Sequence, residues 1–108
     1  MNAKYWQRGE TLDYTPSEAV ESGAVVSLGT RIGIAGTDIA ANEQGQVHVE
    51  GVFELTKDTS VEIALGAAVY YNAAGDVITT ASSGNVPAGY AVQAAAQTSA
   101  TVLVKLLG

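Results

Sequence analysis

The sequence predicts an all-β fold, a small barrel or sandwich of about seven to nine short strands with at most one or two single-turn helices. Glycine recurs at short intervals along most of the 108-residue chain. The stretches between the glycines are rich in Val, Ile, Thr and Tyr, which favour β-strands. The length fits one domain with a modest core.

Eight stretches have the composition and the turn-rich borders of strands. In chain order they are residues 11–15, 24–28, 31–35, 46–55, 68–72, 77–80, 89–93 and 100–106. Alternation supports two of them: Val47 and Val49 share one face, with His48 opposite, and Val104 and Lys105 lie on opposite faces. This period of two is typical of strands with one buried face.

Two further local patterns refine the fold. The run Val69–Ile78 predicts a β-hairpin, because an aromatic strand, a turn with Asn and Gly, and a β-branched strand follow one another. Helix indications are confined to single turns at Pro16–Glu21 and Ser60–Leu65. Neither segment is long enough to form a main element.

A faint internal repeat runs through the sequence. Val20–Val26 resembles Ile63–Val69, and each copy continues to a small-residue strand, Ile32–Ala35 or Ala88–Ala91. Each copy then ends in an alternating strand, at residues 47–50 or 101–106. Two interpretations stay open at this point: two similar β-units packed together, or chance similarity in a glycine-rich chain.

The sequence divides into an extended N-terminal arm, residues 1–9, and a single β domain, residues 10–108. The arm holds the only Trp and two of the five basic residues. Tyr5 and Trp6 form an aromatic pair of the kind that anchors interfaces, so we expect Tyr5, Trp6 and Arg8 to bind a partner. The alternative is that Trp6 folds back onto its own domain.

Composition excludes several function classes. The net charge is −6, and the five Lys and Arg residues are scattered, which argues against nucleic-acid binding. The chain lacks cysteine, so it has no disulfides or thiolate sites. We expect no secretory signal and no membrane span, since the apolar runs are short. Only 15% of residues are charged, which indicates a surface partly covered by a partner or by further copies.

Candidate catalytic residues are few, and we predict a non-enzymatic protein with no cofactor and no metal. The single histidine, His48, is expected on the surface face of its strand. The acids are spread evenly, without a calcium-loop spacing, and no phosphate-binding loop is present. Glu50 and Glu54 are expected on one strand face, and a small carboxylate hydrolase using them remains the enzymatic rival.

Several segments resemble, in order, those of a known family. They are Tyr5–Thr15, Ser22–Val26, Ile32–Ala35, Glu50–Lys57, Gly66–Tyr71, Ala88–Ala91 and Val102–Leu106. The family consists of short prophage-encoded capsid cement proteins, also labelled predicted RecA/RadA-like phage recombinases. The recombinase label conflicts with the residues, because such an ATPase needs a phosphate loop and a much longer chain.

The resemblance implies a bacteriophage structural protein that decorates the capsid surface and stabilises the head. It implies the major capsid protein as partner and virion localisation after synthesis in the bacterial cytoplasm. Similarity to lambda-type head decoration proteins further implies a homotrimer at capsid threefold positions, whose N-terminal arm adds to the capsid. The alternative is a tail or head-completion module that contacts other virion proteins.

Overall fold

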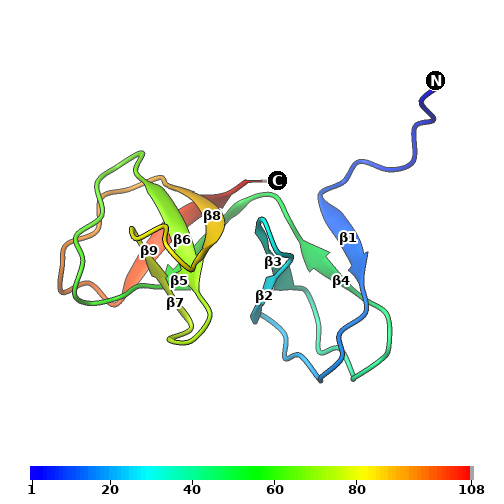
Figure 1. Cartoon of the computed structure of the whole chain (residues 1–108), viewed down its shortest axis with the longest axis horizontal. Helices are drawn as coiled ribbons and strands as arrows, with labels where there is room; N and C mark the ends of the chain where they lie inside the picture. Colours follow the sequence, from blue (N-terminus) through cyan, green and yellow to red (C-terminus); the bar gives the residue numbers. More distant parts are fainter. Residues whose placement is uncertain (108) are drawn as a thin grey trace.

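The computed structural model describes residues 1–107, and these residues form nine strands and no helix (Figure 1). The strands are β1 (Thr11–Tyr14), β2 (Val25–Ser27), β3 (Ile32–Ala35), β4 (Gly45–His48), β5 (Val52–Thr56), β6 (Ala68–Asn72), β7 (Val77–Thr79), β8 (Val86–Ala91) and β9 (Thr101–Leu106). The all-β prediction is therefore confirmed. Gly108, the last residue of the predicted domain, lies outside the described residues.

The two predicted single-turn helices, at residues 16–21 and 60–65, are wrong. Val20 exchanges two backbone hydrogen bonds with Ile39, and Ile63 makes the same two-way bridge to a distant loop. These backbone groups are thereby committed to antiparallel bridges and are not available for i→i−4 bonds within a helical turn.

The strands form two antiparallel sheets packed as an open sandwich, not a closed barrel. The first sheet has the order β1-β4-β3-β2, and the second has the order β5-β9-β8-β6-β7. Figure 1 shows the two sheets side by side, with the first sheet at the right. The hairpin predicted for residues 69–78 is confirmed as the β6–β7 pair.

The predicted strand 46–55 is wrong as one strand, because the chain passes between the two sheets in its middle. β4 ends at His48 in the first sheet and β5 starts at Val52 in the second. Gly51 lies between them with φ of 116°, in a region that residues with a Cβ rarely adopt. The alternating pattern of apolar residues continues across this turn, which explains why the break between β4 and β5 was not visible in the sequence.

The internal repeat is real at the level of strand order and register. The order β1-β4-β3-β2 recurs as β5-β9-β8-β6, and we call β1–β4 the first half and β5–β9 the second half. Equivalent residue pairs are Leu12–Val47 and Phe53–Val104, Ala35–Val47 and Ala91–Val104, Ile34–His48 and Tyr90–Lys105, and Val26–Gly33 and Val69–Gly89. Strand β7 is an addition that only the second half contains.

The turns before β2 and β6 also correspond. The Gly23 N–H donates to the Ala35 carbonyl, and the Gly66 N–H donates to the Ala91 carbonyl, each over 2.8 Å. The two glycines have the same φ of 84°. The sequence similarity of Val20–Val26 to Ile63–Val69 therefore reflects two equivalent backbone paths.

The main core lies between the sheets. One face of the first sheet, which we call the shared face, carries Val25, Ile32 and Ile34 into a cluster with the second sheet. The second sheet contributes most of that cluster, including Leu55 and Tyr71. Burial of these apolar side chains supplies the main driving force for packing the halves together.

The other face of the first sheet, which we call its free face, has a much smaller cluster. Val26, Val47 and Val49 are buried there, and Tyr14 and Leu28 pack against them while remaining half-exposed. The face of the second sheet that points away from the core, which we call its outer face, lies on the surface. The described chain therefore has one well-covered core and two less covered sheet faces.

Candidate functional site

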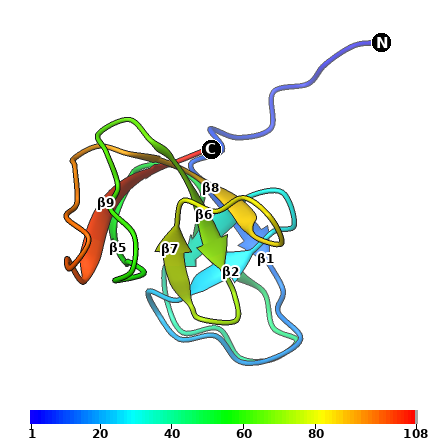
Figure 2. The same cartoon turned by 60° about the vertical axis from the view of Figure 1, so that its left-hand side comes forward.

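The N-terminal arm, residues 1–9, extends away from the sheets. Figures 1 and 2 show it leaving the body in both views. Tyr5 and Trp6 have exposed fractions of 82% and 85%, so neither ring packs on the domain. The alternative in which Trp6 folds back is not what the structure has. Large aromatic side chains exposed to water at an extended terminus are available to a partner.

Local contacts hold only the base of the arm. The Gln7 side-chain amide donates to the Thr11 carbonyl over 3.2 Å, and Arg8 Nη2 lies 3.0 Å from Glu10 Oε1. Both ionic side chains are largely exposed, so this pair contributes little to stability. Gly9 has φ of 83° and open space around it, which lets the chain bend where the arm meets β1.

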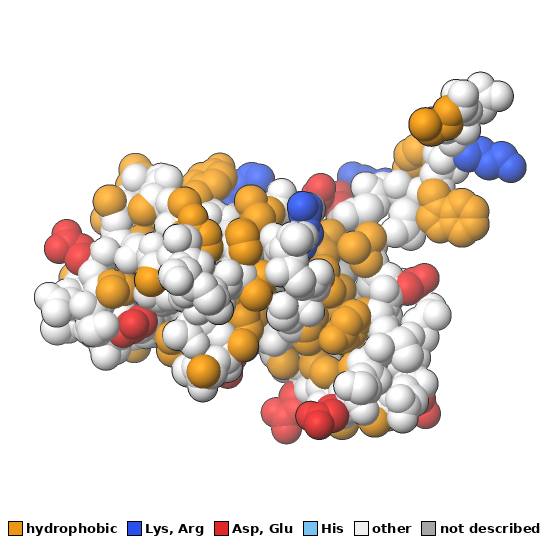
Figure 3. Space-filling model, viewed as in Figure 1, with side chains coloured by type: hydrophobic (Ala, Val, Ile, Leu, Met, Phe, Trp, Pro, Cys, Tyr) orange, Lys and Arg blue, Asp and Glu red, His pale blue; other side chains and the backbone are white. Residues whose placement is uncertain are grey.

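The arm and the domain have opposite charges. Residues 1–9 contain two of the five basic side chains and none of the eleven acids. The arm therefore carries +2 from its side chains and residues 10–108 carry 3 − 11 = −8, which together give the net −6. In Figure 3 the arm shows hydrophobic and basic side chains, whereas acidic side chains lie along the rim of the body. This separation favours an acidic and apolar binding surface for the arm.

His48 is half-buried and belongs to the interface between the sheets, which corrects the prediction of a solvated surface histidine. It does lie opposite Val47 and Val49, as alternation predicts. However, that face is the shared face, and the His48 ring stands 6.0 Å from the Phe53 ring, centroid to centroid. Packing against the second half, and not proton transfer, accounts for its place.

Glu50 and Glu54 are not brought together as a catalytic pair. Glu54 lies on β5, whereas Glu50 lies in the turn before it, so the prediction of a common strand face is wrong. Glu54 lines hollows beside β9 and at the seam between the halves. Glu50 instead borders a separate shallow hollow with Glu10 and His48. The two carboxylates therefore do not converge on one substrate position.

Residues 1–107 contain neither a metal-binding cluster of side chains nor a membrane-spanning helix. No group of three or more His, Cys, Asp or Glu side chains is placed to hold a metal ion in that range. The same range holds no helix of the length and apolarity that crossing a bilayer requires.

Lys57 is a buried cation, and no pattern in the sequence singles it out. Its ammonium group donates to the carbonyls of Asp58, Val61 and Gln97, at 2.7, 2.5 and 2.9 Å. Three acceptors match the three donors of an ammonium group, so the charge is buried with its hydrogen bonds satisfied. Lys57 thereby ties two loops together, and its role is structural.

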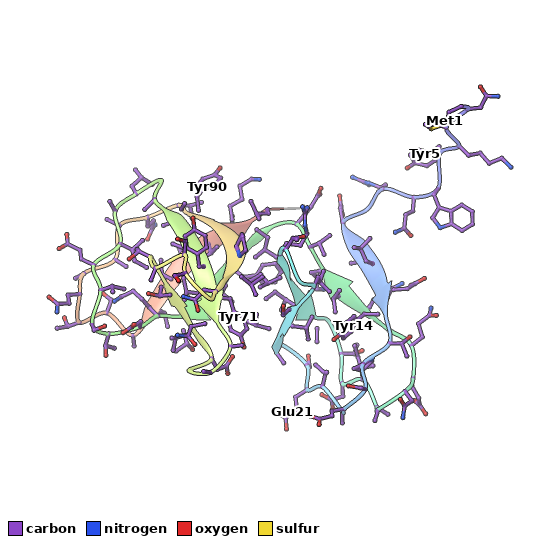
Figure 4. The ribbon with its side chains drawn as sticks, viewed as in Figure 1. Met1, Tyr5, Tyr14, Glu21, Tyr71 and Tyr90 are labelled. Carbon is purple, nitrogen blue, oxygen red and sulfur yellow. The ribbon has the colours of Figure 1, made fainter. Side chains whose placement is uncertain are left out.

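Two polar contacts fix loops of the second half. The Tyr71 hydroxyl donates to Asp76 Oδ1 over 2.6 Å across the β6–β7 turn. Burial, together with this carboxylate, raises the pKa of Tyr71 to about 12. The Ser60 hydroxyl and N–H donate to Asp58 and lower the pKa of its carboxyl. Figure 4 shows Tyr71 facing the seam between the halves.

The comparisons with known proteins point to one family. No match was found among curated proteins or among solved structures. The sequence does match a family described as phage cement protein, over residues 6–106. That name denotes a structural role in stabilising the phage capsid. Because the match covers nearly the whole chain, the protein belongs to the phage cement protein family.

Proposed function

We propose that this protein binds the surface of the assembled phage head and stabilises the shell by contact, without catalysis. The observation that carries the proposal is the arm with its exposed Tyr5 and Trp6, in a chain that matches the cement family. Glu50 and Glu54 line separate hollows, and residues 1–107 hold no group of acids and histidine placed to bind a metal ion, which is consistent with a role based on contact area.

The arm is the proposed docking element. Tyr5 and Trp6 would fill an apolar cleft of the major capsid protein, and Arg8 would pair with an acidic group at its rim. Aromatic and arginine side chains supply most of the binding energy in many interfaces. The positive arm and the negative domain favour a binding orientation in which the arm faces an acidic capsid surface.

The mechanism is mass action. A protein that binds the assembled shell and not the free subunits stabilises assembly by about 2.7 kcal/mol per site at a free concentration of 100 times Kd. We further propose that the protein is prophage-encoded, is made in the bacterial cytoplasm and acts as a homotrimer in the virion. The resemblance to lambda-type decoration proteins and the low surface charge support the trimer.

Deletion of residues 1–8 tests the proposal. We expect the truncated domain to stay folded, because no residue of the arm belongs to either hydrophobic cluster, and to lose capsid binding in co-sedimentation with expanded capsids. The milder Tyr5→Ala/Trp6→Ala double variant should weaken binding by about 100-fold or more. Leu65→Ala, another exposed apolar side chain, is the matched control and should bind normally.

Unchanged capsid binding by the truncated protein would overturn the role of the arm. Electron microscopy of labelled particles separates the rival location, since a tail or head-completion module gives no density on the shell.

A further inference from the structure

The contact between the halves uses one surface from each. The first half presents its shared face, with Val25, Ile34 and His48, and this face covers Leu55 and Tyr71 of the second half. His48 also contacts Phe53, which lies beside them on the same face of the second sheet. Because the two halves are structural repeats, each of these surfaces has a counterpart in the other half.

Part of the counterpart of the shared face is exposed, whereas Ala88, the counterpart of Ile32, is buried. Ile34 and His48 correspond to Tyr90 and Lys105, which are neighbours on the outer face of the second sheet. Tyr90 is 43% exposed, and the Lys105 ammonium lies 5.9 Å from the centre of its ring. Val52, the cross-strand partner of Lys105, is 53% exposed. Figure 4 shows Tyr90 pointing away from the body.

The surface of the second half that the shared face covers also has a counterpart, and that counterpart is partly open. Phe53, Leu55 and Tyr71 correspond to Leu12, Tyr14 and Leu28 on the free face of the first sheet. Leu12 is 37% exposed, and Tyr14 and Leu28 are only half-buried. Each half therefore carries a partly open equivalent of the surface that the other half uses in the contact.

We propose that the outer face of the second sheet docks on the free face of the first sheet in a second copy of this chain. The intermolecular contact repeats the intramolecular one, so Tyr90 of one copy takes the place of Ile34, and Lys105 comes to lie beside Leu12 of the next. A second copy is the occupant because the two complementary surfaces are both present on this chain and are both left open.

The proposed contact is head-to-tail, because two different surfaces meet. Such contacts close into rings or continue as filaments, depending on the rotation between copies. This inference rests on the homo-oligomer of the proposed function, and it specifies the surfaces that form it. The homotrimer is then the closed ring of three copies, with the arm left free for the capsid.

Charge insertion on either surface tests the contact. Tyr90→Asp and Leu12→Lys should each reduce the mass measured by light scattering from that of the oligomer to that of the monomer, with an unchanged circular dichroism spectrum. Lysine is used at position 12 because it would face Lys105 of the next copy and repel it. Leu65→Asp and Leu65→Lys place the same charges on an exposed loop leucine outside both surfaces, and both should leave the oligomer intact. An oligomer that survives both interface changes would overturn the proposal.

Mixing the two variants distinguishes a head-to-tail contact from a symmetric one. The Tyr90→Asp chain keeps its free face, and the Leu12→Lys chain keeps its outer face, so a 1:1 mixture should form a heterodimer and stop there. If the oligomer used one surface on both copies, only one of the two variants would dissociate, and the other would keep its oligomer both alone and in the mixture. That result would refute the head-to-tail arrangement.

Cross-linking supplies an independent measurement, because the chain has no native cysteine. The Leu12→Cys/Lys105→Cys double variant should form covalent chains or rings of three or more copies on mild oxidation, whereas each single variant should form dimers at most. Absence of products from the folded double variant counts against the contact. Arm deletion should leave all these results unchanged, so failure of the capsid-binding proposal and failure of this one are distinguishable.

Discussion

The two halves of the molecule share a strand order but differ in how much apolar surface they bury. The cluster centred on the second half holds thirteen buried residues, and two of them, Ile32 and Ile34, come from the first half. The separate cluster of the first half holds three buried residues. The first half therefore covers the core of the second half, while the free face of the first half itself stays thinly covered.

This asymmetry shows that the same strand order and register can support two roles. In the first half, the shared face packs on the neighbouring repeat and the opposite face remains open. In the second half, loops and the neighbouring repeat enclose one face, and the other is left to solvent. Substitutions at equivalent positions of the two halves should therefore have unequal effects on the free energy of unfolding.

The largest difference in the loss of unfolding free energy is expected between Gly89→Ala and Gly33→Ala, at equivalent positions of β8 and β3. Gly89 has φ of 146°, and a Cβ there would lie 1.9 Å from the Lys105 carbonyl oxygen. The backbone must shift, and we expect a loss of about 4 kcal/mol in unfolding free energy. A Cβ at Gly33 meets the Val47 side chain at 3.0 Å, which can yield, at a cost of about 1 kcal/mol.

Urea unfolding of the two glycine variants measures this difference. Equal losses of unfolding free energy would mean that the close approach of β8 to β9 at Gly89 is no more restrictive than the approach of β3 to β4 at Gly33.

The next largest effect is expected for Lys57→Met. This change keeps the length of the side chain but leaves the three carbonyls around the buried Lys57 position without their donor, and it should cost about 3 kcal/mol. Pro16 is the equivalent position, four residues beyond Leu12 as Lys57 is beyond Phe53, and it makes no such contacts. Pro16→Ala should cost about 1 kcal/mol or less.

Chemical denaturation gives both values for the Lys57 and Pro16 variants. Hydrogen exchange should locate the Lys57→Met effect in the loops that carry Val61 and Gln97. A loss below that of Pro16→Ala would contradict the loop-tying role of Lys57.

The smallest effect is the alkaline pH dependence that Tyr71 gives to the second half. Its pKa is raised to about 12, so the unfolded chain loses this proton near pH 10, before the folded protein does. The contribution is fully present below pH 10 and is lost between pH 10 and 12, by about 2 kcal/mol. Tyr71→Phe should remove that part of the slope, whereas Tyr5→Phe in the arm serves as the control.

Stability measured at intervals from pH 9 to 12 tests the Tyr71 prediction. An identical slope in wild type and Tyr71→Phe would contradict it. In the first half the equivalent residue is Leu28, which has no proton to lose.

Much of the fold could be predicted because its determinants are local. Glycine spacing and alternation located most strands, and Gly23 and Gly66 marked the repeat because equivalent turns need the same left-handed residue. The break at Gly51 could not be predicted. Its conformation follows from the crossing between sheets, which depends on contacts far apart in the sequence, such as β5 with β9.

The exposure of the candidate binding residues could be predicted only in the arm, which lies outside the sheets. Tyr5 and Trp6 stand out because the arm lacks strand alternation and turn glycines. Alternation did place His48 opposite Val47, but it does not tell which face of a sheet a second sheet will cover. The partners of Lys57 are backbone carbonyls, which leave no trace in side-chain pattern.

The length of the arm sets a limit on how the molecule engages a lattice. Nine extended residues reach at most roughly 30 Å, close to the 34 Å intermediate dimension of the chain. If the arm binds the shell as proposed and several copies are joined, the first arm to bind would act as a tether that presents the others at about millimolar effective concentration. Such avidity would lengthen the residence time of the oligomer on the shell by a factor of about 10² to 10⁴ relative to a single arm.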